Sequence, residues 1–416
     1  MKLRPALTLK THLTMKPKLL LLALPLLLAA CSPSSPTSTQ PASELTPAQR
    51  EAQILSSVTQ LTFNRDFDRA GEAYFSKDMR WVVFQGVPKG ESAYQLYVAR
   101  IVYVKGFPSG LVVTTRITPP GSRNTCGWFS DDLKTLIFAS TAGKDDPDES
   151  SPGYQRNSRN YRWAFSKGME IYRVDNWERL VMTSSPGGYV NLATPAHRLT
   201  DNDAYDAECV LSPDGQWIIF CSDRPAAIEG AAPETPSTQP VPRPKQLYAM
   251  KLDGTRFVQL TATPGYNGGP FFSPDGRKLV YRSDRAGNDL LQVYTSDIVR
   301  DQGGNITALA NEQPITSDVN VNWGPYWTPD AKHILYASSK VAHTNYEIFI
   351  RRAAPDRPAP SDGAGTRAES RITFSPGADV LPVVSPDGKY LLWSSKRGDD
   401  PTTQVYIAKL TLPKAP

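Results

Sequence analysis

The chain has 416 residues, of which 40% are hydrophobic and 21% are charged, so it can bury a core and is neither wholly disordered nor fibrous. Its formal net charge is +5, but residues 1–30 hold five basic residues and no acid, which leaves the rest of the chain with a net charge of zero. Because no basic run is interleaved with aromatic residues, the sequence excludes a nucleic-acid-binding protein.

The N-terminus has the pattern of an export signal. The segment "MKPKLLLLALPLLLAAC", residues 15–31, has a basic start, an apolar run and small residues before a cysteine. The apolar run is too short for a membrane span. The ending "LAAC" resembles the lipobox of bacterial lipoproteins, which implies removal of residues 1–30 and lipidation of Cys31. A plain signal peptide with a chance cysteine is the alternative, and translation begins at Met1 or Met15.

A flexible tether is predicted for residues 31–50, because their Ser, Pro and Thr content cannot form a core. The remainder, residues 51–416, is predicted to be one repeat domain.

Six internal repeats organise that domain. Each contains a version of the turn motif "SPDG", which starts at Ser76, Ser130, Ser212, Ser273, Thr328 and Ser385. A Leu-Thr or Ile-Thr pair precedes each motif, by 14 residues in the first repeat and by 12 in the others. Ser, Pro and Gly at these positions favour a tight hairpin turn. We interpret the motif as a marker of blade register that carries no activity itself.

The repeats predict an all-β fold. Runs such as "WIIF" and "KLVY" follow the turns and are apolar on both faces, so each sheet must be covered on both sides. Four strands in a repeat of about 40 residues are typical of a β-propeller. The chain ends on a third strand and begins with an unmatched fourth strand at residues 58–63. We therefore predict a six-bladed β-propeller whose ring is closed by the N-terminal strand completing the last blade.

The repeat pattern resembles a known family. "YDAECVLSPDGQWIIFCSDR" and "YNGGPFFSPDGRKLVYRSDR" are similar to the repeats of the TolB propeller of the Tol-Pal system and of exported WD40-like (PD40) proteins. The resemblance spans residues 58–410 and implies a binding propeller of the bacterial periplasm. Related propellers precede peptidase domains, but no "GxSxG" nucleophile motif occurs in this chain, which excludes a peptidase of that type.

Two insertions interrupt the repeats, at 141–168 and 225–245. The second is rich in Pro and Ala and is interpreted as disordered. The first includes Tyr161 and Trp163 among several arginines, a combination enriched at interfaces. A solvated excursion packed on its own blade is the alternative.

A ring of polar residues is predicted at one mouth of the propeller. In five of the six repeats, the position six residues before the turn motif holds an Asn or Asp, and these are Asn124, Asp206, Asn267, Asn322 and Asp379; in the first repeat that position is Ala70. These side chains could bind a cation or the donors of a peptide, or each could make a local turn to its own backbone. Tyr205, Tyr266 and Trp323 stand beside them and would give a partner an apolar anchor.

Metal and cysteine chemistry have weaker support. Asp201, Asp203 and Asp206 suit calcium but lack the glycine and the distal glutamate of an EF-hand loop. Apart from Cys31 the cysteines are three, at positions 126, 209 and 221, and we interpret them as small buried residues, with a disulfide left open.

The function that follows is a monomeric, non-catalytic scaffold without a cofactor, which binds an envelope protein or a cell-wall ligand through one mouth. Its membrane contact is the lipid anchor alone, on the outer membrane facing the periplasm, since Ser32 follows the cysteine. The alternative is a carbohydrate-active propeller, a polysaccharide lyase or glycosidase, with an acid pair such as Asp203 and Glu208.

Overall fold

The computed structural model describes residues 44–142, 153–156, 161–166, 168–184, 189–193, 195–225, 243–354 and 368–412. The signal segment 1–30, Cys31 and the predicted tether up to residue 43 lie outside the described residues. So does most of the insertion 225–245. Residues 45–416 form one compact unit, and the propeller belongs to this unit.

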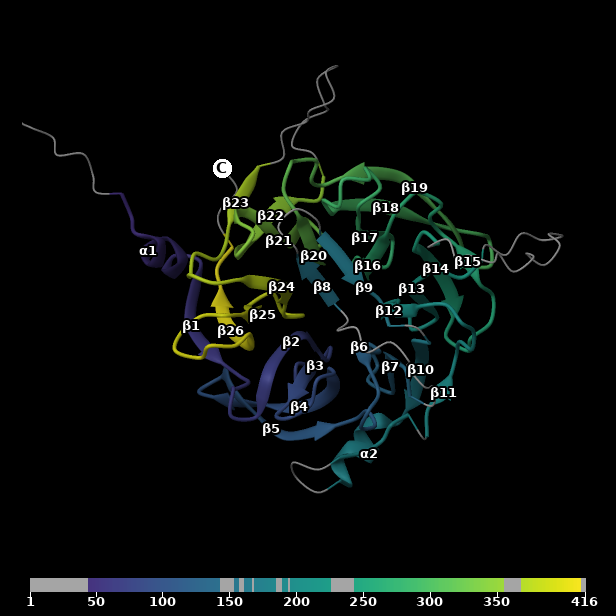
Figure 1. Cartoon of the computed structure of the whole chain (residues 1–416), viewed down its shortest axis with the longest axis horizontal. Helices are drawn as coiled ribbons and strands as arrows, with labels where there is room; N and C mark the ends of the chain where they lie inside the picture. Colours follow the sequence, from purple (N-terminus) through teal and green to yellow (C-terminus); the bar gives the residue numbers. More distant parts are fainter. Residues whose placement is uncertain are drawn as a thin grey trace, which may run out of the picture. The chain divides into compact units, whose positions relative to one another are not determined.

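The described residues form six four-stranded antiparallel sheets, arranged as blades around a central axis (Figure 1). Blade 1 contains β2 (Phe67–Phe75), β3 (Trp81–Pro88), β4 (Gln95–Val104) and β5 (Phe107–Arg116). Blade 2 contains β6 (Asn124–Phe129), β7 (Thr135–Ser140), β10 (Glu170–Asp175) and β11 (His197–Arg198). Blade 3 contains β12 (Asp206–Leu211), β13 (Trp217–Ser222), β14 (Gln246–Lys251) and β15 (Val258–Gln259).

Blade 4 contains β16 (Asn267–Phe272), β17 (Lys278–Ser283), β18 (Gln292–Arg300) and β19 (Ile306–Pro314). Blade 5 contains β20 (Asn322–Trp327), β21 (His333–Ala342), β22 (Asn345–Arg352) and β23 (Glu369–Arg371). Blade 6 contains β24 (Asp379–Val384), β25 (Tyr390–Ser395), β26 (Gln404–Leu410) and β1 (Leu55–Gln60). The predicted six-bladed propeller is confirmed.

The ring closes as the sequence predicts. Strand β1 pairs antiparallel with β26, with Leu55 opposite Leu410 and Gln60 opposite Tyr406. The N-terminal strand therefore completes the last blade and covers the edge that β26 would otherwise expose.

The predicted boundary between tether and domain differs from the structure. Helix α1 (Pro47–Ala52) begins inside the segment assigned to the tether. It forms because Thr46 and Gln49 make a capping box and Pro47 occupies the first turn. Glu51 then accepts hydrogen bonds from Phe374 N at 2.6 Å and Arg397 Nη1 at 2.7 Å, which fix the helix to blade 6.

The repeated motifs have structural roles in every blade. In the turn motif the first hydroxyl donates to the Asp carboxylate two residues later, at 2.5–2.7 Å in all six turns. The Thr of each Leu-Thr or Ile-Thr pair accepts the backbone N–H at the start of a third strand, at 2.8–3.1 Å. These bonds explain why the two motifs keep their spacing.

The two faces of the propeller differ. We name the face with the six turns the turn face, and the face where the chain passes from one blade to the next the crossing face. Helix α2 (Trp177–Met182) lies in the connection between the third and fourth strands of blade 2, β10 and β11. The insertion 141–168 contains a separate hairpin, β8 (Gly153–Arg156) and β9 (Tyr161–Ala164).

Candidate functional site

The five residues of the predicted polar ring lie at the positions in the blades that the repeats predict, but their side chains are buried. Each of the five residues begins an innermost strand, and each is at most 4% exposed. Asn124 accepts from Ser140 Oγ at 2.7 Å and donates to Gln95 Oε1 at 3.1 Å. Asp206 receives Ser222 Oγ and the guanidinium of Arg224. These side chains are therefore hydrogen-bonded within and between blades, although Asn322 Oδ1 is buried without a hydrogen-bond partner among the described residues, and their role in binding stays a prediction.

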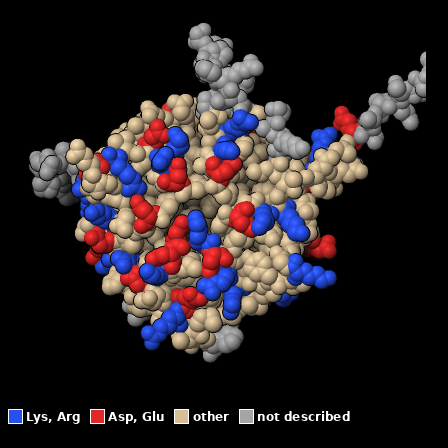
Figure 2. Space-filling view, turned by 180° about the vertical axis from the view of Figure 1, so that it is seen from behind, with Lys and Arg blue, Asp and Glu red and all other residues tan. Residues whose placement is uncertain are grey.

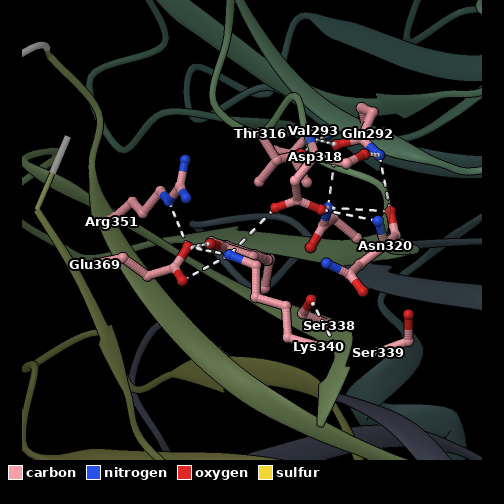
Figure 3. A network of polar contacts seen from close by, with 12 residues as sticks. Gln292, Val293, Thr316, Asp318, Asn320, Ser338, Ser339, Lys340, Arg351 and Glu369 are labelled. Carbon is pink, nitrogen blue, oxygen red and sulfur yellow. Dashed lines mark hydrogen bonds and ion pairs between the residues drawn. The ribbon is translucent and has the colours of Figure 1, made fainter. Parts of the chain in front are cut away.

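Figure 3 shows the same use of polar groups between blades 4 and 5. Gln292 Nε2 donates to the carbonyls of Asp318 at 3.0 Å and Asn320 at 2.8 Å. Lys340 lies between two carboxylates, with Nζ 3.2 Å from Asp318 Oδ2 and 2.6 Å from Glu369 Oε1. Burial raises the pKa of Asp318, but hydrogen bonds and Lys340 outweigh it and hold that pKa below its usual range. This network fixes the passage that leads to Asn322.

The aromatic residues beside the ring are mostly covered. Tyr205 is 8% exposed, Tyr266 is 5% exposed and Trp323 is half-buried. Phe165, which follows β9, has its ring 4.9 Å from that of Tyr205 and 5.4 Å from that of Tyr266. In Figure 1 the hairpin that precedes Phe165 is seen across the centre of the ring. The structure thus places two of the three expected anchors beneath an aromatic side chain and not at an open surface.

Two other sets of predicted residues do not assemble into a site. Tyr161 and Trp163 belong to β9, but their side chains lie outside what the structure describes. Asp201 pairs with Arg198 at 2.7 Å, Asp203 is exposed and Asp206 is held inside blade 3. The described residues contain no group of three or more His, Cys, Asp or Glu that could hold a metal. Calcium binding stays an untested prediction.

The channel is lined by residues that the sequence did not single out. One residue of every innermost strand has a positive φ, between 43° and 58°. It is the third residue of five of these strands and the sixth of β2, and the six are Glu72, Cys126, Glu208, Gly269, Gly324 and Leu381. All six line a cavity of about 30 Å³, which has room for about two water molecules. The left-handed residue is the bulge at which each innermost strand shifts register against its neighbour.

Glu208 joins blades 3 and 4 inside this cavity. Its Oε2 accepts from Tyr266 Oη and Gly269 N, both at 2.6 Å, and from Arg282 Nη2 at 3.2 Å. Although burial lowers the pKa of Arg282, the neighbouring Tyr266 and Glu208 raise it overall. Arg282 therefore stays charged and neutralises Glu208.

Glu72 has hydrogen-bond donors but no cation bonded to it among the described residues. Tyr74 Oη donates at 3.1 Å, Cys126 Sγ donates at 3.0 Å, and Gln85 Nε2 donates to the other oxygen. Burial raises the pKa of Glu72, and the charge of Glu208 acts in the same direction. The channel centre is thus a buried polar belt with one carboxylate more than it has cations.

An aromatic layer closes the channel on the turn-face side of this belt. Ring centroids lie 5.1 Å apart for Tyr74 and Trp128, 5.6 Å for Trp128 and Phe271, and 5.3 Å for Phe271 and Tyr326. Trp128, Phe271 and Tyr326 are the fifth residues of their innermost strands, and Tyr74 is the last residue but one of β2, the equivalent place in blade 1. They separate the polar belt from the turn face.

An apolar funnel of about 160 Å³ opens outside the aromatic layer. Its floor is formed by Trp128, Phe271 and Tyr326 and by the last residue of each of the six innermost strands. Its rim holds the second residue of all six turn motifs, which are Lys77, Asp131, Pro213, Pro274, Pro329 and Pro386. Figure 2 shows the face opposite the β8–β9 hairpin, with a hollow at its centre and charged side chains around it. The funnel is the candidate functional site.

The remaining cysteines are free thiols. Cys209 and Cys221 are buried and Cys126 is partly buried, without a disulfide among them. Burial raises the pKa of the thiols of Cys126, Cys209 and Cys221. The interpretation of these residues as small buried side chains therefore fits two of the three, while Cys126 also contributes a donor to the polar belt.

Comparisons with known proteins give distant similarities. No protein-family profile matches the sequence. Dipeptidyl-peptidase 5 of Porphyromonas endodontalis is 27% identical over 188 residues, which are 37% of this chain and 27% of that protein. An uncharacterized protein of Agrobacterium fabrum is 26% identical over 179 residues, which are 42% of this chain and 50% of that protein. The chain thus spans about a quarter of the first protein and half of the second.

Solved structures are similar at low identity. A putative TolB from Agrobacterium tumefaciens is 16% identical, with a TM-score of 0.43 and coverage of 82% of this chain and 91% of that one. TolB from Acinetobacter baumannii is 15% identical, with a TM-score of 0.43 and coverage of 82% and 63%. An oligogalacturonate lyase in complex with manganese is 14% identical, with a TM-score of 0.42 and coverage of 85% and 93%.

Among the described residues, no helix combines the length and the apolar character needed to cross a membrane. The strand topology itself identifies the chain as a six-bladed β-propeller, the fold that its resemblance to TolB-like repeats implies.

Proposed function

We propose that this chain is a non-catalytic binding scaffold of the bacterial cell envelope, which engages a protein or cell-wall partner through the funnel on its turn face. The single observation that carries the proposal is the apolar funnel, to which all six blades contribute. Exposed or partly exposed aromatic and proline side chains in a concave surface are what a partner's apolar side chain can bury against. The export signal and the lipobox-like "LAAC" support a lipid anchor at Cys31.

The position of the funnel favours binding over acid–base chemistry. The two carboxylates of the channel, Glu72 and Glu208, lie behind the aromatic layer in a cavity with room for about two waters. A glycosidase needs two carboxyl groups that reach the substrate from either side. The charged pair at the rim, Lys77 and Asp131, is joined by an ion pair of 3.0 Å, so it forms part of a recognition surface and not an acid–base dyad. These features support the scaffold over the carbohydrate-active alternative.

The test places a charge at the funnel rim without changing the fold. Pro274 is exposed at the second position of its turn, where Lys77 and Asp131 stand in blades 1 and 2, so the variant Pro274→Glu should fold normally. Arg277→Glu introduces the same side chain in the same turn, at a position outside the funnel. The partners are captured from detergent-solubilised envelopes of the source bacterium with the full-length protein and with each variant.

We expect Pro274→Glu to lose partners that the wild type and Arg277→Glu retain. Equal capture by all three proteins would refute the funnel as the binding site. Turnover of a polysaccharide by the pure wild-type protein would replace the scaffold by the enzymatic alternative.

A further inference from the structure

The hairpin formed by β4 and β5 projects beyond the rest of blade 1 on the turn-face side. Strand β4 continues past Arg100, which pairs with the first residue of β3. We name residues 100–112 the blade 1 hairpin. Tyr103 Oη donates to a backbone carbonyl of the blade 1 turn at 2.7 Å, and Tyr390 Oη of blade 6 donates to a carbonyl at the hairpin tip at 2.9 Å. These bonds hold the projecting part in place.

Apolar side chains are exposed on the blade 1 hairpin. Tyr103 is 40% exposed, Val104 is 55% exposed and Val112 is 45% exposed. They are three of the eleven large apolar side chains that are exposed in the described part of the chain. Leu111, by contrast, packs against the buried core. Exposed apolar side chains that gather on one projection indicate a contact surface.

The blade 1 hairpin is also basic. Residues 95–116 contain no Asp or Glu and three basic residues, which are Arg100, Lys105 and Arg116. Only Arg116 among them is in an ion pair within the part of the chain that the structure describes, with Nη1 2.6 Å from Glu91 Oε1. Lys409 of blade 6 is exposed beside the tip, with Nζ 5.9 Å from the ring centroid of Phe107, and the described residues give it no ion pair either.

The acidic residues near the hairpin already have cationic partners. Asp78 and Asp387 lie close enough to Tyr103 to affect its pKa, which burial raises to about 12. Asp78 is paired with Arg80, and Asp387 Oδ2 lies 3.1 Å from Lys389 Nζ. Both partners belong to the turns of blades 1 and 6. The cations of the hairpin and its neighbour in blade 6 are therefore not neutralised by these carboxylates.

The corresponding hairpin of blade 4 has the opposite character. Strands β18 and β19 form a projection of similar length. It carries three acids, each in an ion pair, which are Asp297, Asp301 and Glu312. Its tip, residues 301–305, reads "DQGGN" and has no apolar side chain. Because the propeller fold accepts this polar tip, the apolar and basic tip of blade 1 is not a requirement of the fold.

We propose that the blade 1 hairpin docks on a membrane surface with anionic phospholipid headgroups. Val104 enters the headgroup layer, while Lys105 and Lys409 reach the phosphates. Each basic side chain near such a surface strengthens the attachment, and a single acyl chain needs a second attachment for stable anchoring. The inference rests on the envelope location in the proposed function but not on the funnel. It adds a protein contact to the lipid anchor at Cys31, which the sequence predicts as the sole membrane contact.

The test uses residues 32–416, which omit the export signal and Cys31 but keep the whole compact unit, residues 45–416. Membrane binding by this protein cannot come from an acyl chain. Its cosedimentation is measured with large unilamellar vesicles of phosphatidylcholine alone and of phosphatidylcholine mixed with an equal amount of phosphatidylglycerol. We expect binding to the anionic vesicles at low salt, a decrease as the salt concentration rises, and far weaker binding to the neutral vesicles.

The variants Val104→Glu and Lys105→Glu test the hairpin. Both side chains are exposed, so both variants should fold. The matched controls are Val299→Glu, at a valine of β18 that is 37% exposed, and Lys332→Glu, at an exposed lysine of the blade 5 turn. We expect each hairpin variant to weaken binding to the anionic vesicles by at least about fivefold, and each control by less than about twofold. Thermal melting followed by circular dichroism confirms the fold of each protein.

The outcomes separate the hairpin from the funnel. Equal binding to the two kinds of vesicle, or binding to neither, would overturn the membrane contact, and so would equal weakening by the hairpin variants and their controls. Pro274→Glu should bind the vesicles as the wild type does, and its failure to do so would place the contact at the funnel and overturn the hairpin. A negative vesicle result leaves the capture of partners by the funnel as a separate measurement.

Discussion

The variant Glu208→Gln tests the buried polar belt. Glu208 and Arg282 are each 8% exposed, and the guanidinium lies 3.2 Å from Glu208 Oε2. The substitution keeps the size of the side chain but removes its charge. Arg282 therefore loses its ion pair with Glu208. It also puts an amide group where Tyr266, Gly269 and Arg282 all donate hydrogen bonds to Glu208 Oε2.

Breaking a buried ion pair by removing one partner costs about 3–5 kcal/mol. Glu72 lies close enough to Arg282 for each charge to affect the other's pKa, which compensates part of the loss. We therefore expect the free energy of unfolding to fall by about 3 kcal/mol, near the lower end of that range. Equilibrium unfolding in urea, followed by tryptophan fluorescence, measures this difference.

The matched control is Glu72→Gln, the same chemical change at the same position of the innermost strand in blade 1. Among the described residues no cation is bonded to Glu72, and its carboxylate is disfavoured by burial, so its neutralisation should change the free energy of unfolding by less than about 1 kcal/mol. Equal losses in the two variants would refute the assignment of Arg282 to Glu208, and so would a loss below 1 kcal/mol in Glu208→Gln.

The remaining predictions concern pH, ring closure and thiols. Because the folded-state pKa of Glu72 is raised by burial and by Glu208, its contribution to stability is lost as the pH rises above the usual carboxyl range; the urea midpoint of the wild type should fall relative to that of Glu72→Gln as the pH rises above that range, and parallel curves would contradict this. Deletion of residues 51–64 removes β1 and the buried side chains of Leu55 and Leu61, so we expect a loss of at least about 3 kcal/mol and a lower melting temperature in calorimetry; an unchanged melting temperature would show that closure does not support the ring. The buried thiols of Cys209 and Cys221 should not react with Ellman's reagent until the protein unfolds, and the unfolded mature protein should then show three thiols in all if Cys31 is lipidated and four if it is not.

The blades could be predicted from the sequence because their signals are local. A turn hydroxyl finds its Asp two residues away, and the Thr of each Leu-Thr or Ile-Thr pair caps the strand beside it. Such contacts recur with the same residue types in each repeat. The register that they define correctly places the start of five innermost strands, at Asn267 and its four equivalents, whereas β2 begins at Phe67, three residues before the equivalent Ala70.

The channel lining could not be found in this way, because its residues differ from blade to blade. Glu72 and Glu208 stand at the same position as a cysteine, a leucine and two glycines. Sequence repeats reveal positions whose residue types recur, whereas at this position only the left-handed backbone conformation recurs from blade to blade. The glycines at 269 and 324 were the available signal, since glycine adopts a positive φ without strain. The expected ring lies two residues earlier, where the side chains turn into the blade and form hydrogen bonds there.

The turn motif has a second role that its turn chemistry conceals. Its Ser and Asp are used by the turn in all six blades, but its second residue faces the funnel, where proline is found in four blades and Lys77 and Asp131 in the other two. Proline there both presets the turn and supplies an apolar rim. If the funnel binds a partner as proposed, this one position of the motif contributes to binding as well as to shape. Because the two charged positions are adjacent in the ring, the rim is not symmetric. A partner held by this surface would be oriented by that asymmetry, with its apolar contacts toward blades 3 to 6 and its charged contacts at the junction of blades 1 and 2.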